Sequence, residues 1–258
     1  QQSITRDGVR LLCCGKDLRV ERTATGKRLL VDSHGQHYDV TVDEILVGVG
    51  RSPNVEGLGL ETIGVEYDKT GVKVNDRLQT TNPRIYAAGD ICSRYKFTHA
   101  ADAMAQIVIQ NALFPHPFGL GYASMESLIM PWCTFTEPEI AHVGLYEADA
   151  KKKGLEIETY TYKLGEVDRA ILDGEQEGFA RIHIQKGTDE ILGATIVAAH
   201  AGDLISEFSV AMKAGAGAKT IAATIHPYPT RVEVNKRVVN LWRKAHFTAR
   251  TKMLLTRL

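Results

Sequence analysis

The feature that most constrains the fold of this chain is a short apolar run, residues 84–88, that stops at Gly89-Asp90 and soon leads into a helix. The run predicts a strand, and the glycine after it lets the backbone approach a neighbouring group closely. Thr98 is a suitable N-cap for a helix over residues 99–113, whose first amides favour negative charge. The Asp90 carboxylate can accept hydrogen bonds from hydroxyl groups. These residues predict either a ligand site at the helix start or a plain turn before a capped helix.

One apolar stripe is expected along this helix, made of residues at the spacing of a single helical face: Ala101, Met104, Ala105, Val108 and Ala112. Pro115 and Pro117 end the helix and place a domain boundary at residues 118–124. Before the helix, short strands are expected at residues 9–14, 18–21 and 28–31. Residues 44–50 form a nearly continuous apolar run, which predicts a strand buried on both faces.

Beyond the boundary the pattern changes to strands followed by helices. A short helix is expected at residues 147–153, then strands at residues 156–163, 178–186 and 191–199. The next helix has one apolar face, made of Leu204, Ile205, Phe208, Ala211 and Met212. The last helix runs from about residue 230 and aligns Val234, Val238, Leu241, Trp242 and Ala245. Strands followed by helices indicate an α+β layer rather than a doubly wound sheet.

Charge and cysteine usage exclude several classes of protein. The 31 basic residues balance 31 acidic ones, so charge gives no argument for a nucleic-acid partner. The longest apolar stretches stop near six residues, short of the ~18 that a membrane span needs. The four cysteines show no CxxC spacing, which predicts reduced thiols, an intracellular protein and no metal site. Adjacent Cys13-Cys14 could bind a soft metal, but two packed strand cysteines are the preferred interpretation.

Asp90 and the helix start together suit a flavin, with the carboxylate at the ribityl hydroxyls and the helix beneath the pyrimidine carbonyl. Residues 82–90 resemble the second FAD motif of the pyridine nucleotide–disulfide oxidoreductases, with the mercuric reductases and dihydrolipoamide dehydrogenases among the similar members. Further segments are similar to the same family in the same order: residues 46–54, 136–145, 177–181, 191–194 and 201–205. The resemblance extends over residues 1 to about 245.

This resemblance implies an α/β plus α+β chain in three parts. Residues 1–50 would end the NAD(P)H-binding domain, residues 51–124 would be the second part of the FAD-binding domain, and residues 125–258 would be a dimerisation domain with an antiparallel sheet. FAD, NAD(P)H and a homodimer are implied. The residues expected at the cofactors are Gly50, Gly89, Asp90, Thr98 and His99. His99 either tunes the flavin or is simply exposed in the first helical turn.

The acid/base segment of the family, His-Pro-Thr-x-x-Glu, is matched by residues 228–233, with Tyr228 at the histidine position and Glu233 retained. Tyr228 and Glu233 are therefore the candidate catalytic residues. The alternatives are an interface aromatic for Tyr228 and a solvated helix residue for Glu233. His226 is either a substitute base or, preferably, a packed or surface histidine. Mercuric reductases resemble this chain in having tyrosine here, but no cysteine follows Cys133 to match their C-terminal pair.

The expected activity is NAD(P)H-dependent reduction, through FAD, of a disulfide, a metal or another small acceptor. The chain alone is expected to be inactive, because its glycine pairs at 57/59 and 119/121 lack the third glycine of a dinucleotide loop. The alternative is a non-catalytic dimerisation module without flavin. The expected location is cytoplasmic. A basic C-terminal tail favours either a surface helix or a weak contact with an anionic membrane surface; its basic residues are Lys236, Arg237, Arg243, Lys244, Arg250, Lys252 and Arg257.

Overall fold

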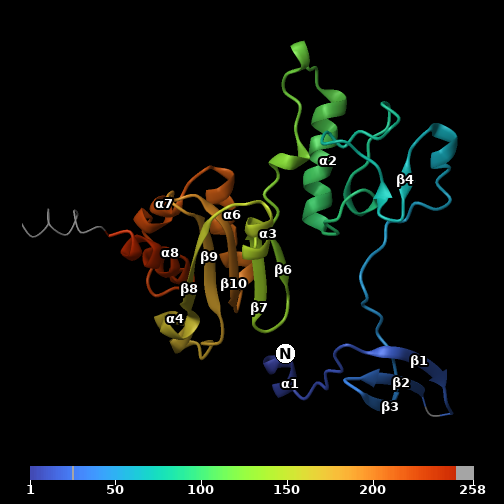
Figure 1. The fold of residues 1–258 in the computed structure, drawn as a ribbon, viewed down its shortest axis with the longest axis horizontal. Helices are drawn as coiled ribbons and strands as arrows, with labels where there is room; N and C mark the ends of the chain where they lie inside the picture. The colour runs from blue at the N-terminus through green and yellow to red at the C-terminus, as the bar shows by residue number, and fades with distance from the viewer. Residues whose placement is uncertain (25, 248–258) are drawn as a thin grey trace, which may run out of the picture. The chain divides into compact units, whose positions relative to one another are not determined.

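The computed structural model describes residues 1–24 and 26–247, and the chain divides into two compact units, Gln1–Arg51 and Ser52–Leu258. Each unit is described by itself (Figure 1). The three functional parts expected from the sequence stay a prediction, because a compact unit does not by itself identify what it binds.

The first unit is a small antiparallel sheet preceded by helix α1 (Gln2–Arg6). Its strands β1 (Lys16–Arg22), β2 (Lys27–Ser33) and β3 (Gln36–Val42) lie in that order. A turn at His34-Gly35, both with positive φ, joins β2 to β3. Arg28 on β2 donates two hydrogen bonds, of 2.8 and 2.6 Å, to the carboxylate of Asp39 across the sheet. The expected strands at 18–21 and 28–31 are confirmed, whereas β3 was not predicted.

Two strand predictions in this unit are wrong. Residues 9–14 form no strand, and Cys13 and Cys14 are exposed instead of packed. Cys14 has a φ of 56°, a left-handed conformation that no strand residue adopts. Residues 44–50 also form no strand, and the side chains of Leu46 and Val49 are 97% and 91% exposed. Among the described residues no strand pairs with this run, so its backbone has no ladder to join.

The second unit opens with short elements around one long helix. These are η1 (Leu60–Ile63), β4 (Tyr67–Asp68), β5 (Gly71–Val72), η2 (Gly89–Ile91), α2 (Thr98–Leu113), η3 (Pro117–Gly119) and η4 (Met125–Ser127). The strand expected at residues 84–88 is reduced to one isolated bridge, between Gln79 and Tyr86. The expected helix is confirmed as α2, which begins at Thr98 with Phe97 as its N-cap.

The buried face of α2 differs from the predicted stripe. Its buried residues are Ala100, Met104, Ile107 and Asn111, so only Met104 was predicted. Alanines on several sides of the helix made two faces look equally apolar in the sequence. Asn111 lies on the buried face, where its amide nitrogen donates to the carbonyls of Arg77 and Ala123 at 3.1 and 2.9 Å. A buried amide with partners is stable in a core.

The rest of the second unit is a five-stranded antiparallel sheet in the order β6-β7-β10-β9-β8 (Figure 1). The strands are β6 (Trp132–Thr134), β7 (Glu139–Gly144), β8 (Ile157–Lys163), β9 (Phe179–Gln185) and β10 (Ile191–Ala198). On its core face Ile196 pairs with Ala141 on one side and Ala180 on the other, and all three are fully buried. The three strands expected from the sequence are confirmed as β8, β9 and β10, while β6 and β7 were missed.

Helices complete this core. They are α3 (Glu147–Lys152), η5 (Leu164–Glu166), α4 (Asp168–Leu172), α5 (Ala201–Leu204), α6 (Ser206–Lys213), α7 (Ala218–Ala223) and α8 (Glu233–Ala245). Buried side chains of α5, α6, α7 and α8 share one apolar cluster with the sheet. The predicted apolar faces are largely confirmed, since Phe208 and Val238 are fully buried, but Ala245 is exposed. The expected helix after residue 200 is divided at Ile205 into α5 and α6, and α7 was not predicted.

Candidate active-site loop and flavin-site residues

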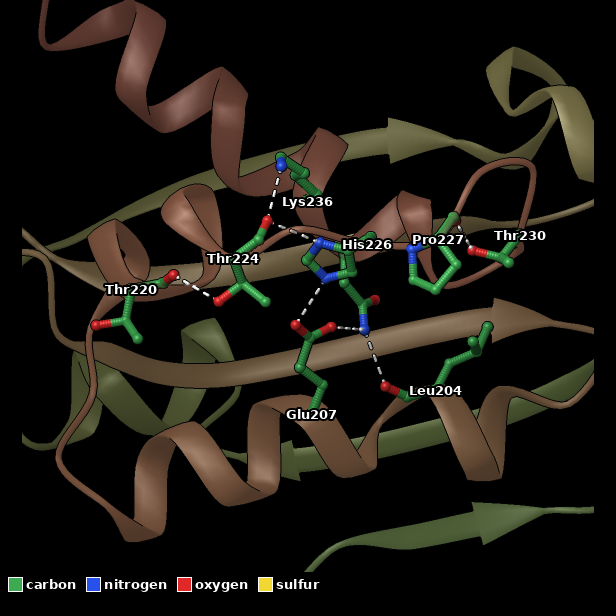
Figure 2. Close-up of polar contacts among 9 residues, drawn as sticks. Leu204, Glu207, Thr220, Thr224, His226, Pro227, Thr230 and Lys236 are labelled. Atoms are coloured by element: carbon green, nitrogen blue, oxygen red, sulfur yellow. Dashed lines mark hydrogen bonds and ion pairs between the residues drawn. The ribbon is translucent and has the colours of Figure 1, made fainter.

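The candidate catalytic tyrosine lies on the loop between α7 and α8. Figure 2 labels its neighbours His226, Pro227 and Thr230. Tyr228 stands between Pro227 and Pro229, and its side chain is 69% exposed. Its hydroxyl donates a hydrogen bond of 2.8 Å to the Asp168 carboxylate, at the first residue of α4. This hydrogen bond raises the pKa of Tyr228 above its ordinary value. Near neutral pH the side chain is therefore a hydrogen-bond donor and not a base.

Glu233, the second candidate catalytic residue, begins α8 and is paired within its own helix. Its Oε1 accepts a hydrogen bond of 2.9 Å from Nε of Arg237 and forms an ion pair of 2.7 Å with a terminal guanidinium nitrogen. The Glu233 side chain is only 14% exposed. Its charge adds to the rise in the pKa of Tyr228, although Asp168 contributes more. The structure thus brings Tyr228 and Glu233 near each other but gives the tyrosine a different carboxylate as its partner.

His226 is a packed histidine, 6% exposed at its side chain. Its Nε2 lies 2.8 Å from Oε1 of Glu207 on α6, and its Nδ1 lies 3.2 Å from the Thr224 carbonyl oxygen (Figure 2). The second carboxylate oxygen of Glu207 accepts from Asn235, whose amide also donates to the Leu204 carbonyl, both at 2.9 Å. A carbonyl and an ionised carboxylate only accept, so a protonated ring can donate to both and a neutral ring to one.

The residues expected at the flavin lie around the start of α2. Gly89 has a φ of 81°, and a Cβ added there would lie 2.9 Å from the Cβ of Ala101 on α2. Lys96 donates to the carbonyl oxygen of Asp90 at 2.5 Å, which fixes the turn between them. Thr98 is the first helical residue and makes no side-chain cap, and the first turn contains no acidic residue. The helix therefore presents uncapped amides, which favour an electron-rich carbonyl.

A cavity of about 610 Å³ opens beside this helix start. Its lining includes Lys96, Thr98 and His99 from the flavin-site side and Trp132, Cys133 and Phe135 from the sheet side. His99 is held by a 2.8 Å hydrogen bond from Nε2 to the Pro131 carbonyl oxygen. Burial, with a contribution from Glu139, raises the pKa of the Cys133 thiol to about 11. The lining also contains the carboxylates of Glu139 and Asp203, and the thiol stays protonated near neutral pH.

Three further expectations concern residues and groups outside these sites. Gly50 has a φ of 106° and lies in the first unit, so it is described apart from the other four residues expected at the cofactors. Among the described residues, no group of three or more histidine, cysteine, aspartate or glutamate side chains could hold a metal ion. Within the same residues, no helix is both long and apolar enough to cross a membrane.

Three residues of the candidate site were not singled out from the sequence: Asp168, Glu207 and Arg237. Arg237 follows Glu233 by four residues, a spacing at which opposite charges pair on a helix, so this contact was predictable. Asp168 and Glu207 lie far from the loop in sequence, and no local signal connects them to it. They are brought to the loop by the packing of α4 and α6 in the second unit.

The class of fold expected from the sequence has two kinds of part. One is an α/β part with a glycine-aspartate turn before a long helix, and the other is an α+β part with an antiparallel sheet. The family described as "Pyridine nucleotide-disulphide oxidoreductase" matches residues 1–105, and the family described as "Pyridine nucleotide-disulphide oxidoreductase, dimerisation domain" matches residues 130–239. The chain belongs to the class I pyridine nucleotide–disulfide oxidoreductase family. Members of this family depend on FAD and NAD(P)H.

Individual relatives give the same result. A mercuric reductase from Staphylococcus aureus is 35% identical over 233 residues, which are 90% of this chain and 42% of that protein. A dihydrolipoyl dehydrogenase from Thermus scotoductus is 32% identical over 236 residues, which are 90% of this chain and 50% of that protein. The chain thus spans about half the length of the relatives it matches.

Solved structures confirm the fold class. LpdA from Mycobacterium tuberculosis superposes with a TM-score of 0.80 at 26% identity, covering 93% of this chain and 51% of that one. The HOCl-induced flavoprotein disulfide reductase RclA from Escherichia coli superposes with a TM-score of 0.79 at 24% identity, covering 93% and 54%. At that identity the second likeness shows the fold alone.

Proposed function

We propose that this chain is the part of a flavin-dependent NAD(P)H oxidoreductase that completes the flavin site and meets the electron acceptor. The observation that carries the proposal is the order of the two family matches, residues 1–105 and 130–239, with an exposed tyrosine on the loop that holds the family's acid/base segment. FAD, when bound, takes a hydride from NAD(P)H and passes the electrons on. The chain alone lacks a dinucleotide loop in its sequence and is proposed to be inactive.

In this proposal the residues before and at the start of α2 hold the flavin. Asp90 accepts hydrogen bonds from ribityl hydroxyls, and Gly89 allows its turn to pack against the helix. The uncapped amides at Thr98 and His99 stabilise negative charge on the pyrimidine carbonyl. Gly50 is proposed to lie near the nucleotide cofactor. This proposal rests only on the resemblance of residues 46–54 to the family.

Tyr228 is proposed to donate a hydrogen bond to the acceptor or to a thiolate formed from it. Asp168 keeps the hydroxyl protonated and directed, because its carboxylate accepts the hydrogen bond from the hydroxyl. A histidine at this position would exchange protons near neutral pH, whereas a tyrosine with a raised pKa does not. Glu233, held by Arg237, is proposed to contribute its charge to the site instead of bonding the tyrosine directly.

The proposed acceptor is therefore one whose reduction needs no side chain that titrates near neutral pH. We expect a quinone or a metal ion to be reduced faster than lipoamide or glutathione disulfide by the flavin-loaded enzyme. Steady-state rates with this panel of acceptors test the proposal. Equal or better rates with the two disulfides would refute the argument from Tyr228. Protein that purifies as a colourless, stable dimer would instead favour the non-catalytic dimerisation module.

The homodimer, the cytoplasmic location and the membrane contact are proposed for the whole protein. The matched dimerisation domain supports a homodimer. The membrane contact would have to use other basic residues of the tail than these two: Lys236 donates to the Thr224 carbonyl oxygen and Arg237 pairs with Glu233 within the domain. Arg250, Lys252 and Arg257 lie outside the described residues. Stronger sedimentation with anionic than with neutral vesicles would support the membrane contact.

A further inference from the structure

The loop that carries Tyr228 has little backbone support. In the part of the chain that the structure describes, no backbone–backbone hydrogen bond reaches residues 225–229. Pro227 and Pro229 have no N–H group to donate. On the C-terminal side, the Thr230 hydroxyl donates to the Pro227 carbonyl oxygen at 2.6 Å and closes the loop on itself. Side chains must therefore fix where the loop lies on the domain.

The buried attachment is the pair of His226 and Glu207 (Figure 2). Their side chains are 6% and 24% exposed, and a 2.8 Å hydrogen bond joins them. Glu207 is itself fixed, because its second oxygen accepts from Asn235, which is completely buried. Lys236 adds a contact from α8, since it donates to the same Thr224 carbonyl oxygen that faces the imidazole. A charged hydrogen bond shielded from water is stronger and more directional than an exposed one.

We propose that His226, held by Glu207, is a positioning residue that sets where the Tyr228 hydroxyl lies. Only Pro227, with its fixed φ, separates the buried imidazole from the tyrosine, so little freedom is left between the anchor and the hydroxyl. The inference rests on the proposed function, because the position of the hydroxyl matters to the reaction only if Tyr228 meets the acceptor.

The titration of Tyr228 reports its position directly. The charged groups that face it are Asp168 on α4 and Glu233 and Arg237 on α8. Asp168 raises the pKa of Tyr228 most, through the 2.8 Å hydrogen bond, Glu233 raises it further, and Arg237 lowers it. A loop released from its anchor would separate the hydroxyl from Asp168. The pKa of Tyr228 would then fall toward the ordinary value of about 10.

The experiment is an NMR titration of the whole chain with tyrosine labelled at the ring carbon that bears the hydroxyl, and Tyr228→Phe identifies the signal. We expect His226→Ala to lower the midpoint of Tyr228 as far as Asp168→Asn does. His226→Gln should restore most of the shift, since its amide can still donate to Glu207. The matched control is His246→Ala, which removes another histidine–glutamate contact, the one of 3.3 Å between His246 and Glu158. This variant should leave the midpoint of Tyr228 unchanged.

His226→Asn, which is too short to reach Glu207, is the second variant if His226→Ala does not fold. An unchanged Tyr228 midpoint in a folded variant of either kind would overturn the proposal, as would an equal shift in the His246→Ala control. Failure of His226→Gln to restore the shift would also count against it. The titration needs no turnover, so this inference and the proposed function can fail separately. Acceptor kinetics that Tyr228→Phe leaves unchanged would refute the proposed function of Tyr228 but not the positioning of its hydroxyl by His226.

Discussion

Tyr228 combines an exposed ring with a hydroxyl that is tied to one carboxylate. The Asp168 hydrogen bond of 2.8 Å keeps its proton in place, while Glu233 is paired with Arg237 at 2.7 Å. Exposed hydrogen bonds are readily exchanged for others, so the hydroxyl can turn to an arriving acceptor at small cost. The residue is thus suited to donate a hydrogen bond repeatedly without titrating.

Gly178, just before β9, leaves less room for an added Cβ than any other glycine of the described residues. Its φ is +123°, and an added Cβ would lie 1.8 Å from the Val197 carbonyl oxygen on β10. We expect Gly178→Ala to destabilise the chain by more than about 3 kcal/mol, because backbone must move. Gly187→Ala is the control, since Gly187 also has a positive φ but no atom within 4 Å, and should cost about 1–2 kcal/mol.

Urea unfolding of both variants measures the difference. Equal free energies of unfolding for Gly178→Ala and Gly187→Ala would show that the close approach to Val197 has no energetic consequence.

At this scale the sequence indicated candidate residues but not the side chains that they contact. Tyr228 and Glu233 were identified by their place in a motif, and the pairing of Glu233 with Arg237 follows from a four-residue spacing. The contact between Tyr228 and Asp168 spans 60 residues and depends on where α4 packs, which no local pattern records. The packed state of His226, preferred from the sequence, agrees with its 6% exposure.

Among the elements, the five-stranded sheet contains two histidines that its packing keeps neutral. His142 and His183 are 2% and 4% exposed. Burial is the main cause that lowers the pKa of each below the ordinary value, while Gly144 and Asp149 oppose the shift at His142 and Glu147 opposes it at His183. Each imidazole shares one hydrogen bond with a threonine hydroxyl, at 2.8 Å between His142 and Thr195 and at 2.9 Å between His183 and Thr159.

These histidines predict how stability depends on pH. A lowered pKa in the folded state means that the unfolded chain binds protons first as the pH falls. The stability that the two neutral histidines contribute is therefore fully present above the pKa of histidine in the unfolded chain, about 6.5. It is lost as the pH falls toward their lower pKa values in the folded chain. We expect the free energy of unfolding to decrease between pH 6.5 and 5, by up to about 1.4 kcal/mol per pH unit for each histidine.

Urea unfolding at pH 7.5, 6 and 5 tests this expectation, and the double variant His142→Gln, His183→Gln should show a flatter dependence. The control is His34→Gln, which changes an exposed turn residue of the first unit. A wild-type stability that stays constant from pH 7.5 to 5 would contradict the account.

Helices and strands were predicted well where apolar residues repeat with a clear period. They were predicted poorly where the structure of a segment depends on contacts with distant parts of the chain. The apolar pattern of residues 191–199 matches β10, whose inward side chains lie in the core. Residues 44–50 have an equally apolar sequence, yet they form no strand, because a strand requires hydrogen-bonding neighbours as well as apolar side chains. The predicted face of α2 missed Asn111, because a count of apolar residues ignores a polar side chain that is buried with two carbonyl partners.

For the whole molecule, the matched dimerisation domain predicts self-association. The family's interface would be isologous, with the same surface of both copies in contact. Large exposed apolar side chains on the second unit, such as Ile225 at 90% and Leu172 at 70%, are available for such a contact. We expect a dimer in sedimentation velocity at micromolar concentration, and a monomer at that concentration would contradict this expectation. A lysine at Leu172 should weaken the dimer if this surface is the interface.

The central claim is that Tyr228 acts on the acceptor and not on the flavin or the nicotinamide. Stopped-flow measurement of both half-reactions in the flavin-loaded enzyme, with wild type and Tyr228→Phe, tests it most directly. The variant removes only the hydroxyl and its hydrogen bond to Asp168. We expect flavin reduction by NAD(P)H to proceed at the wild-type rate, and flavin reoxidation by the acceptor to slow about tenfold, the loss of one hydrogen bond of roughly 1.4 kcal/mol. Reoxidation at the wild-type rate with every acceptor would show that Tyr228 is an interface aromatic and contradict the account.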